Sequence, residues 1–405
     1  MTKLTNILIG PIDLPTEFRI SPQVQTNPGM GGAEFHSIQL ALELSKNFGV
    51  TLWIRTGWLF CDDLKVCRNF RPEEVFDLQI CYTGHAVTDA VHNVKLIAIS
   101  HHPFDGSIKH LPERIAAIVN VGRYQLLSNA RTAARLGARQ YWLPVFYPPS
   151  QAALRTVITG RGFKVGHLSS LHPSKGFHVV LKGWTRFQES SPPQSTLEVI
   201  GGISLYGFEE THSDLPVAAV YGQRLMKILE QGNPKTVVFR GRVAGDLSEE
   251  LQAWDAAVLN PKAIGESENV SMKDCWRNGV PVISGNYFGH RDYMKDFPEL
   301  VAGSPRKISN VLKRLQKDPE LREQLRQRSL KRYDQLVESG KVSRLGWNQL
   351  VADILENETP ANEGVFLRFR PTISETLGLF RDELFLTGLR AAIWLSARLR
   401  GPQDA

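Results

Sequence analysis

Short apolar segments of the chain alternate with segments in which apolar residues recur every three or four positions. Buried strands of a parallel sheet are continuous apolar runs, whereas amphipathic helices repeat with a period of about 3.6 residues. A helical pattern begins at Ala33, directly after a glycine-rich stretch. The alternation predicts a doubly wound parallel sheet. Its strands are expected at 6–11, 50–57, 76–84, 95–103 and 116–122.

A second series of the same kind begins beyond residue 150, and Pro148 and Pro149 mark the expected linker. Open α/β sheets bind ligands outside the carboxyl ends of their strands. We therefore expect an α/β protein of two Rossmann-like, doubly wound domains that face a central cleft. The strands of the second domain are expected at 163–169, 197–202, 236–243, 256–261 and 280–285, and its helices at 177–188, 247–254 and 270–278.

From about Ser309 onward the pattern becomes helical. The last predicted helix, 373–400, mixes leucine, phenylalanine and tryptophan with arginines, so it either packs across the first domain or lies on an anionic membrane. Packing is the simpler interpretation because basic amphipathic faces are common on ordinary helices. The predicted domains are the N-terminal domain 1–150, the second domain 151–308 and a helical extension 309–405.

Composition and charge narrow the class of partner. A chain of 405 residues, 42% of them hydrophobic, exceeds what one core usually organises, which agrees with two domains. The excess of 48 Lys and Arg over 41 Asp and Glu gives a net charge of +7 and favours anionic partners. No basic run interleaved with aromatic residues, no helix-turn-helix and no zinc-ligand spacing is visible, so nucleic-acid binding is not expected.

The cysteines and the N-terminus bear on location. The four cysteines show no metal-site spacing, and so few in a long chain indicate reduced thiols in a cytosol-like compartment. The N-terminal stretch is interpreted as the first strand rather than as a signal peptide. No stretch is apolar enough to span a bilayer. The predicted location is cytoplasmic, with membrane association dependent on the final helix.

Three glycines, Gly29, Gly31 and Gly32, stand immediately before the helix that begins at Ala33. Glycine lets backbone N–H groups approach an anion, and a helix N-terminus favours negative charge. The spacing is not that of the G-x-G-x-x-G fingerprint. The stretch is therefore either an anion-binding loop or a tight turn.

A lysine and a glycine, Lys175 and Gly176, open the predicted helix 177–188. A cation is electrostatically unfavourable at a helix N-terminus. A bound phosphate would be attracted by both the lysine and the helix N-terminus and would offset their repulsion. The alternative is a solvated surface lysine.

Acidic residues cluster where the helix 270–278 begins: Glu266 and Glu268 precede it and Asp274 lies one turn inside it. Acids near a helix start can simply complement the helix dipole and cap free N–H groups. They can also accept hydrogen bonds from hydroxyls. A phosphate would then bind the amides at the helix start while a carboxylate accepts from a ribose diol. Those amides belong to Asn269, Val270 and Ser271.

These segments together resemble the motifs of retaining, sugar-nucleotide-dependent glycosyltransferases of the GT-B fold, the glycogen-synthase-like group. The acidic motif is Glu266, seven residues and Asp274, followed by Gly279 and Pro281. The segment GGAE is similar to the family's N-terminal glycine loop, and VGHLSSLHPSKG to its Gly-Arg-Leu…Lys-Gly loop. The segments VVFRGRV and LSEELQAWDAAVLNP resemble what precedes its acidic motif. The resemblance covers roughly residues 5 to 300, and the motifs are specific together rather than singly.

The resemblance implies a role for each matched residue. Lys175 would neutralise the diphosphate, Glu266 would lie near the transferred sugar, and Asp274 would bind the ribose hydroxyls. Either His101 or His102 would be the histidine that ends a first-domain strand and faces the sugar. The other implied ligands are Gly31 and Gly32 at the phosphates or the acceptor, His167 in place of the phosphate-binding arginine, Asn269, Val270 and Ser271 at the distal phosphate, and Arg242 and Val243 near the base.

The sequence departs from the family pattern at three places. His167 replaces an arginine, and the loop that follows it is longer than usual. Asp274 replaces a glutamate and is one methylene shorter, so the diol must lie closer or be met through water. Residues 267–269, Ser-Glu-Asn, replace Gly-Phe-Gly. Glu268 is therefore either a group that contacts a donor hydroxyl or a solvated side chain.

The activity implied is transfer of a sugar from a nucleoside-diphosphate sugar to an acceptor hydroxyl, with retention at the anomeric carbon and without a cofactor or metal ion. The leaving phosphate would take the acceptor's proton, so no general base is predicted. The expected partners are a nucleotide-sugar donor and a carbohydrate or lipid-linked acceptor. One alternative is a sugar-nucleotide binding or regulatory protein of the same fold that has lost turnover, which the departures motivate. Another is a sugar-nucleotide epimerase, which would form product without any acceptor.

Overall fold

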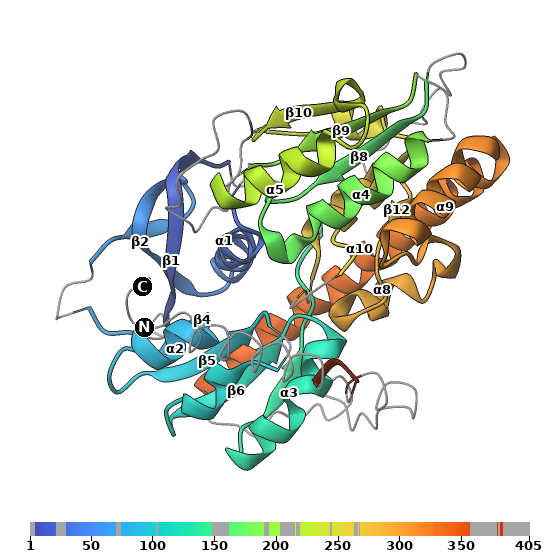
Figure 1. The fold of residues 1–405 in the computed structure, drawn as a ribbon. Helices are drawn as coiled ribbons and strands as arrows, with labels where there is room; N and C mark the ends of the chain where they lie inside the picture. The colour runs from blue at the N-terminus through green and yellow to red at the C-terminus, as the bar shows by residue number, and fades with distance from the viewer. Residues whose placement is uncertain are drawn as a thin grey trace, which may run out of the picture.

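Two parallel sheets organise the chain in the structure, a computed structural model (Figure 1). The predicted linker at Pro148 and Pro149 lies outside the described residues, and so does the last predicted helix, 373–400, except at 379 and 381–383. The structure describes residues 5–21, 30–69, 74–102, 104–147, 162–189, 194–202, 215, 219–243, 245–262, 266, 268–356, 379 and 381–383.

The first sheet has seven strands in the order β3-β2-β1-β4-β5-β6-β7, and all of its pairs are parallel. The chain moves outward from β1 on one side and then returns to build the other side, so the predicted doubly wound topology is confirmed. The strands are β1 (Asn6–Arg19), β2 (Gly49–Phe60), β3 (Lys65–Cys67), β4 (Leu78–Tyr82), β5 (Lys95–Ser100), β6 (Ile115–Asn120) and β7 (Gln140–Trp142).

Strands β1 and β2 are longer than the sequence predicts. Their pairing continues to Arg19 and Phe60 through several register shifts. Such irregularities increase the local twist and bend a strand pair. Gly57 lies in this pair with a φ of +70°, and a Cβ there would be 2.5 Å from the carbonyl oxygen of Thr16, so only glycine fits. The bent pair extends past the end of the neighbouring strand β4.

Helices pack on the first sheet to complete an α/β unit, which we call the first unit. The helix expected from Ala33 begins one residue earlier, and its buried face includes Ile38, Ala41 and Leu44. The helical elements of this unit are α1 (Gly32–Leu44), α2 (Thr83–Thr88), the 3-10 turn η1 (Gly106–His110) and α3 (Arg123–Arg135).

The second sheet has five parallel strands in the order β10-β9-β8-β11-β12, which confirms the second series of strands. A close approach fixes its packing, because a Cβ on Gly166 would lie 1.9 Å from the ring of the fully buried Trp254. The strands are β8 (Lys164–Leu168), β9 (Thr196–Ile200), β10 (Val237–Gly241), β11 (Ala256–Val258) and β12 (Val282–Ile283).

The helices around the second sheet complete the second unit. The predicted helix 177–188 has the predicted bounds, because Gly176 adopts a left-handed φ of 75° between it and the preceding turn. Its elements are η2 (Pro173–Lys175), α4 (Phe177–Gln188), α5 (Ala219–Leu229), η3 (Pro234–Thr236), α6 (Ser248–Gln252), α7 (Val270–Arg277), η4 (Phe288–His290), α8 (Arg291–Met294), η5 (Pro298–Leu300) and α9 (Pro305–Lys317).

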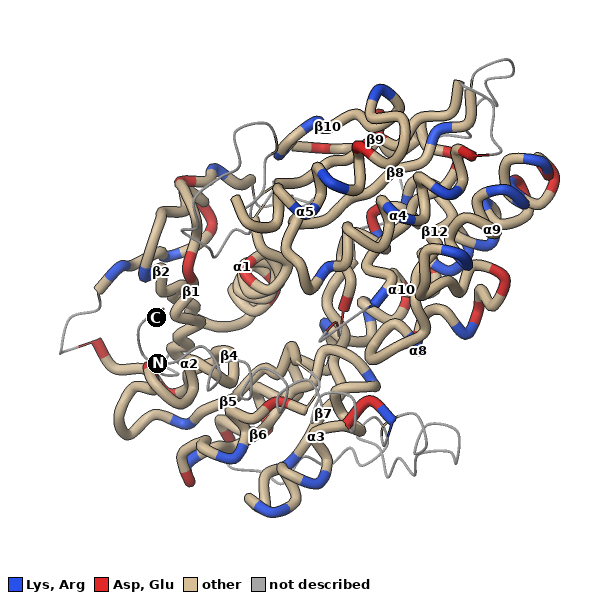
Figure 2. The backbone as a smooth tube through the Cα atoms, viewed as in Figure 1, with Lys and Arg blue, Asp and Glu red and all other residues tan. Residues whose placement is uncertain are grey.

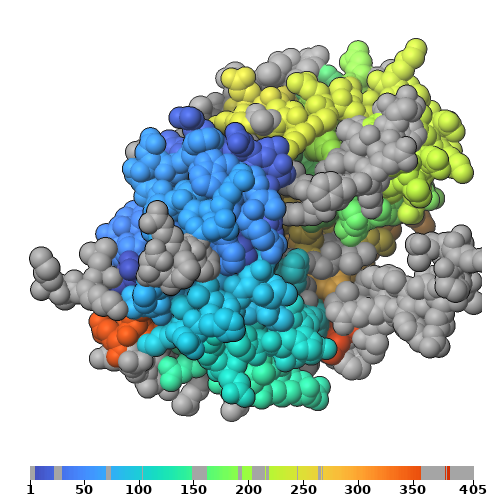
Figure 3. Space-filling model, turned by 90° about the vertical axis from the view of Figure 1, so that its left-hand side faces the viewer, coloured from blue at the N-terminus to red at the C-terminus, as the bar shows by residue number. Residues whose placement is uncertain are grey.

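The long helix α10 (Pro319–Leu355) belongs to both units (Figure 1). It packs against α7 and α9 in its first half. In its second half Ser343 Oγ donates to the carbonyl oxygen of Pro144 at 2.6 Å, and Lys95 Nζ of β5 donates to that of Ile354 at 2.5 Å. Figure 3 shows the orange end of α10 beside the blue and cyan first unit. The predicted helical extension is therefore shared structure rather than an appendage.

A residue of the C-terminal segment also joins the units. Asp382 Oδ2 accepts hydrogen bonds from the Tyr124 hydroxyl of α3 at 2.8 Å and from the backbone N–H of Phe288 at 3.0 Å. Figure 1 shows this short dark-red segment beside α3. Asp382 therefore contacts both units, and the packing of the final helix stays a prediction.

Charged residues are spread over both units (Figure 2). Lys and Arg recur along α3, α4 and α9, and acidic positions lie in the segments around these helices, so in this view the positive charge forms no continuous stripe. Among the described helices, none has the length and apolar character needed to cross a membrane.

Candidate active site

Two helix N-termini meet between the units. Gly32 begins α1 and Val270 begins α7, and a Cβ on Gly32 would lie 2.9 Å from Cγ2 of Val270. Gly31, the N-cap of α1, makes no side-chain capping bond, so the first N–H groups of α1 are not capped there. The predicted glycine loop and the start of the acidic-motif helix are thus neighbours. Two positive helix ends that face one volume favour an anion.

Asn269 has a structural role at this place. Its Oδ1 accepts a hydrogen bond from the N–H of Met272 at 3.0 Å and so caps α7. Its Nδ2 lies 3.2 Å from Nε2 of the buried His290. The cap uses the N–H of Met272. The backbone N–H groups of Val270 and Ser271, which are predicted to bind phosphate, lie at the helix start between Asn269 and Met272.

Lys175 and Glu266 form an ion pair through Nζ and Oε1. Lys175 ends the turn η2 and is partly exposed, whereas Glu266 is buried. Burial opposes ionisation of Glu266, but the charge of Lys175 and its hydrogen bond hold the pKa of this carboxyl below its ordinary value. The predicted lysine is therefore not a solvated surface residue. It contacts the first acid of the motif.

The structure distinguishes the two candidate histidines. His102 is exposed, and it is near enough to Glu266 to contribute to the lowered pKa of that carboxyl. His101 packs inward, with its ring centroid 4.8 Å from Tyr82 and 5.5 Å from His36. Burial lowers the pKa of His101 well below its ordinary value and keeps it neutral. His102 is the histidine placed toward Glu266.

Asp274 lies one turn inside α7, and its carboxylate makes no hydrogen bond with the described residues that is seen in the structure. Burial raises its pKa to about 7, with Asp246 adding to the rise and Arg277 opposing it. Asp246 lies in the segment between β10 and α6. Lys175 contacts Glu266 rather than Asp274, and the predicted convergence of Lys175 and Asp274 on one ligand stays a prediction.

The loop after β10 begins with Arg242 and Val243. Arg242 is exposed, and Val243 is half-buried against the hydrophobic core. Asp246, whose charge contributes to the raised pKa of Asp274, belongs to the same segment. This position is compatible with the predicted contact between the loop and a base whose ribose Asp274 would hold.

The assignment of His167 needs correction. Its side chain is fully buried in β8, its Nδ1 lies 2.6 Å from the carbonyl oxygen of Val258, and its ring packs on Phe177 at 4.8 Å. Burial lowers its pKa to about 4, so the imidazole is neutral. A neutral ring inside the core cannot replace a phosphate-binding arginine. His167 joins β8 to β11 instead.

Glu268 also differs from both expectations. It is neither solvated nor open to a donor, because its carboxylate forms an ion pair with the buried Lys273 and accepts a hydrogen bond from Tyr147 at 2.7 Å. Tyr293 donates to its other oxygen. The ammonium of Lys273 lies 4.3 Å from the ring centroid of Tyr293. The extra acid of the motif is a buried, fully partnered group.

A cavity of about 380 Å³ lies in the first unit beside His102. Its lining carries hydroxyl, imidazole and carboxylate groups from α2 and from the segment after β5. Asp105 Oδ2 accepts from the hydroxyls of Thr83 and Ser100, which orients the carboxylate. The polar lining is formed by Arg55, Tyr82, Thr83, His85, Thr88, His101, His102, Asp105 and Ser107, so both candidate histidines border the cavity.

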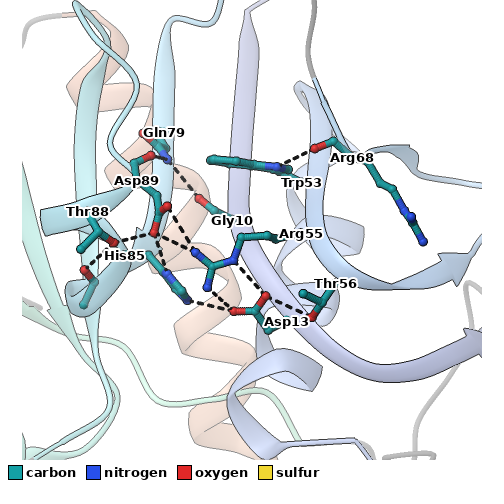
Figure 4. Close-up of polar contacts among 11 residues, drawn as sticks. Gly10, Asp13, Trp53, Arg55, Thr56, Arg68, Gln79, His85, Thr88 and Asp89 are labelled. Carbon is teal, nitrogen blue, oxygen red and sulfur yellow. Dashed lines mark hydrogen bonds and ion pairs between the residues drawn. The ribbon is translucent and has the colours of Figure 1, made fainter. Parts of the chain in front are cut away.

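Arg55 lies between two carboxylates at the edge of this cavity (Figure 4). Its Nε is 3.0 Å from Oδ1 of Asp13, its Nη1 is 3.3 Å from Oδ1 of Asp89, and Nδ1 of His85 is 3.0 Å from Oδ2 of Asp89. The hydrogen bond from Arg55 holds the pKa of Asp13 below its ordinary value. Because two carboxylates neutralise Arg55, the cavity offers oriented polar groups rather than a free cation, which suits a hydroxyl-rich ligand.

Sequence reasoning missed the cavity residues and the partners of Glu268. Arg55 and His85 stand within ordinary strand and helix patterns, and nothing in their spacing marks a site. Lys273 is the one of these residues that the sequence could have indicated. It lies in a helix with a buried face, where a lysine needs a counter-charge, and Glu268 is five residues before it.

Comparison with known proteins gives the family of the second unit. The model of the family described as glycosyl transferases group 1 matches residues 156–332. That segment holds Lys175, Glu266 and Asp274. This part of the chain is therefore similar to the glycosyl transferases group 1 family. No curated protein matches the sequence.

Solved structures show that the chain has a GT-B fold. Sucrose-phosphate synthase from Thermosynechococcus elongatus superposes with a TM-score of 0.63 at 15% identity, over 88% of this chain and 100% of that chain. HepE from Anabaena, solved with UDP and glucose, gives 0.57 at 13% identity, over 87% of this chain and 99% of that one. TarM from S. aureus, solved with UDP, gives 0.51 at 14% identity, over 69% of this chain and 55% of that chain. This chain thus spans about half the length of TarM.

The predicted resemblance and fold class are confirmed by these comparisons. Two parallel α/β sheets with a helical C-terminal part form a GT-B glycosyltransferase fold, and the group 1 domain coincides with the unit expected to hold the donor. The roles of the individual site residues stay predictions.

Proposed function

We propose that the protein transfers a sugar from a nucleoside-diphosphate sugar to a hydroxyl of a carbohydrate acceptor, with retention at the anomeric carbon and without a metal ion. The observation that carries this proposal is the meeting of the N-termini of α1 and α7 at Gly32 and Val270. UDP sugars are the first donors to test, because HepE and TarM were solved with UDP.

The diphosphate is proposed to lie at the two helix ends. Backbone N–H groups there, with the ammonium of Lys175, would stabilise the charge that grows on the leaving diphosphate. Lys175 would then move from Glu266 toward the phosphate, and Glu266 would be released to accept from sugar hydroxyls. Asp274, on the same helix and beside the loop after β10, would accept from the ribose diol.

The reaction would exchange one bond to the anomeric carbon for another. The bond from that carbon to the diphosphate oxygen breaks, and the bond to the acceptor oxygen forms on the same face. The acceptor's proton passes to the leaving phosphate, so the protein supplies charge stabilisation and positioning rather than a general base.

The acceptor is proposed to occupy the cavity of the first unit. The cavity borders His102, which faces Glu266, so a hydroxyl held there would lie toward the donor. Its lining of hydroxyls, imidazoles and paired carboxylates favours a polyhydroxylated ligand over an apolar chain.

A nucleotide-sugar screen tests the donor. A ligand that binds the folded state raises the melting temperature by mass action, so one UDP sugar should stabilise the wild-type protein. Lys175→Met should lose this stabilisation, whereas Lys182→Met, which changes an exposed lysine on the neighbouring helix α4, should keep it. Equal stabilisation of both variants would contradict the assignment of Lys175.

Turnover separates an enzyme from a binding protein. We expect transfer to a carbohydrate acceptor in the presence of EDTA, with the anomeric configuration of the product determined by NMR. Binding without transfer or hydrolysis would favour a regulatory protein of the same fold. Product formed without an acceptor would favour an epimerase.

A further inference from the structure

Glu268, which stands where the family pattern has a phenylalanine, connects the two units. The carboxylate of Glu268 is 6% exposed and receives three partners, Lys273, Tyr147 and Tyr293. Two of these partners, Lys273 on α7 and Tyr293 on α8, belong to the second unit. Tyr147 comes from the first unit.

Tyr147 stands at the joint between the units. It is the last described residue before the linker, and its ring lies 6.2 Å from that of Tyr333 on α10. A Cβ on Gly340 of α10 would be 3.4 Å from its backbone nitrogen. Tyr147 therefore lies where the chain leaves the first unit, and it packs there on α10 and on Glu268.

The other end of the connection is the donor loop. Glu268 is two residues from Glu266, whose carbonyl oxygen accepts from the N–H of Gly289 at 3.0 Å. The next residue, Asn269, caps α7. A short segment held on both sides transmits a displacement of Glu268 to Glu266 and to the helix start, because closely packed groups shift together.

We propose that Glu268 is a positioning residue that couples the angle between the two units to the geometry of the donor site. When the units are closed, the Tyr147 hydroxyl holds Glu268, and the loop presents Glu266 and the first amides of α7. When they open, that hydrogen bond breaks and the loop loses its support from the first unit. The inference rests on the proposed function only where UDP is used as a ligand.

The two tyrosines provide a matched experiment. Tyr147→Phe and Tyr293→Phe each remove one hydroxyl that donates to Glu268, and both leave the ion pair with Lys273 in place, so both variants should fold. Both hydroxyls are deeply buried, and burial raises the pKa of each tyrosine well above its ordinary value. A purely structural role for the network predicts similar effects of the two substitutions. Coupling predicts that only the change at the joint affects closure.

Small-angle scattering without ligand measures closure directly. We expect a larger radius of gyration for Tyr147→Phe than for the wild type, and no change for Tyr293→Phe. Calorimetry with UDP then measures the donor site, and the dissociation constant should rise about tenfold for Tyr147→Phe, the scale expected for a lost hydrogen bond to a charged group, and less than about twofold for Tyr293→Phe.

The outcomes separate the two proposals. Equal scattering and equal UDP affinity in both variants would overturn the coupling. A wild-type protein that does not bind UDP would count against the proposed donor, and the scattering comparison would still decide whether Tyr147 and Glu268 control closure. Restoration of UDP affinity when the Tyr147→Phe protein is closed by an engineered interunit crosslink would support the coupling.

Discussion

Gly32 and Val270 come from opposite units, yet a Cβ on Gly32 would lie 2.9 Å from Cγ2 of Val270. This separation is shorter than real Cβ contacts, so a side chain at position 32 requires either the Val270 side chain or one helix end to shift. The absence of a Cβ is therefore what lets the two N-termini approach each other and form a joint anion site.

Gly32→Ala should weaken UDP binding about tenfold, because a displacement of the two helix ends lengthens the hydrogen bonds to phosphate. Calorimetry measures the loss. Adding Val270→Ala removes the clashing methyl and should recover most of the affinity. Unchanged affinity in Gly32→Ala would show that the phosphate does not lie between these helices.

Variants of the ion pair between Lys175 and Glu266 should change the stability of the protein and its affinity for UDP independently. Lys175→Met leaves the buried carboxylate of Glu266 without its partner and should lower the free energy of unfolding by roughly 1–3 kcal/mol, reduced from the fully buried case because Lys175 is 32% exposed. The double variant Lys175→Met with Glu266→Gln should recover the stability but not UDP binding. Urea denaturation and calorimetry measure the two quantities. Recovery of both would identify the pair as purely structural.

Because of Asp274, the stability of the folded protein should depend on pH in the opposite direction to that expected for a carboxylate in an ion pair. Burial raises its pKa from 3.8 to about 7, so between these values the folded chain binds more protons than the unfolded chain. Its contribution therefore favours folding at low pH and is lost as the pH rises from about 4 to about 7.

Asp274→Asn should consequently stabilise the protein relative to the wild type at pH 8 and have little effect at pH 4. Urea denaturation at the two pH values tests this difference. The same variant should weaken UDP binding if the carboxylate accepts from the ribose. Equal stability at pH 8 would mean that the carboxylate is well solvated.

The two histidines after β5 should respond differently to substitution. His102→Ala should leave the melting temperature unchanged, since the side chain is exposed, and should lower kcat/KM for transfer by about ten- to a hundredfold as a lost contact to the sugar. His101→Ala removes a buried ring that packs on Tyr82 and should lower the melting temperature. A stable, fully active His102→Ala protein would remove this residue from the site.

The helices and strands whose bounds depend on neighbouring residues in the sequence could be predicted. The helix 177–188 appears with its predicted bounds because Gly176 and an apolar face are both local features, and the start of α7 is fixed by the capping of Asn269. Strand positions followed from continuous apolar runs. The family resemblance correctly gave the fold because its motifs lie at these local boundaries.

What sequence reasoning missed depends on residues that are distant in the chain. The burial of Glu268 requires a hydroxyl from Tyr147, which is 121 residues away, and the neutral role of His167 depends on a strand 91 residues further on. The bent extension of β1 and β2 arises from register shifts between the two strands. These features depend on contacts between distant segments, so the sequence of one segment does not reveal them.

The path of α10 has a practical consequence for dissecting the molecule. Cutting the chain at the linker would separate the strands of the two sheets but leave Pro144, Tyr147 and Lys95 without the helix that covers them. An isolated N-terminal fragment would present this uncovered groove to solvent and should aggregate. Supplying the segment of α10 in trans, or fusing it behind the N-terminal fragment, would be required for that half to be handled as an autonomous protein.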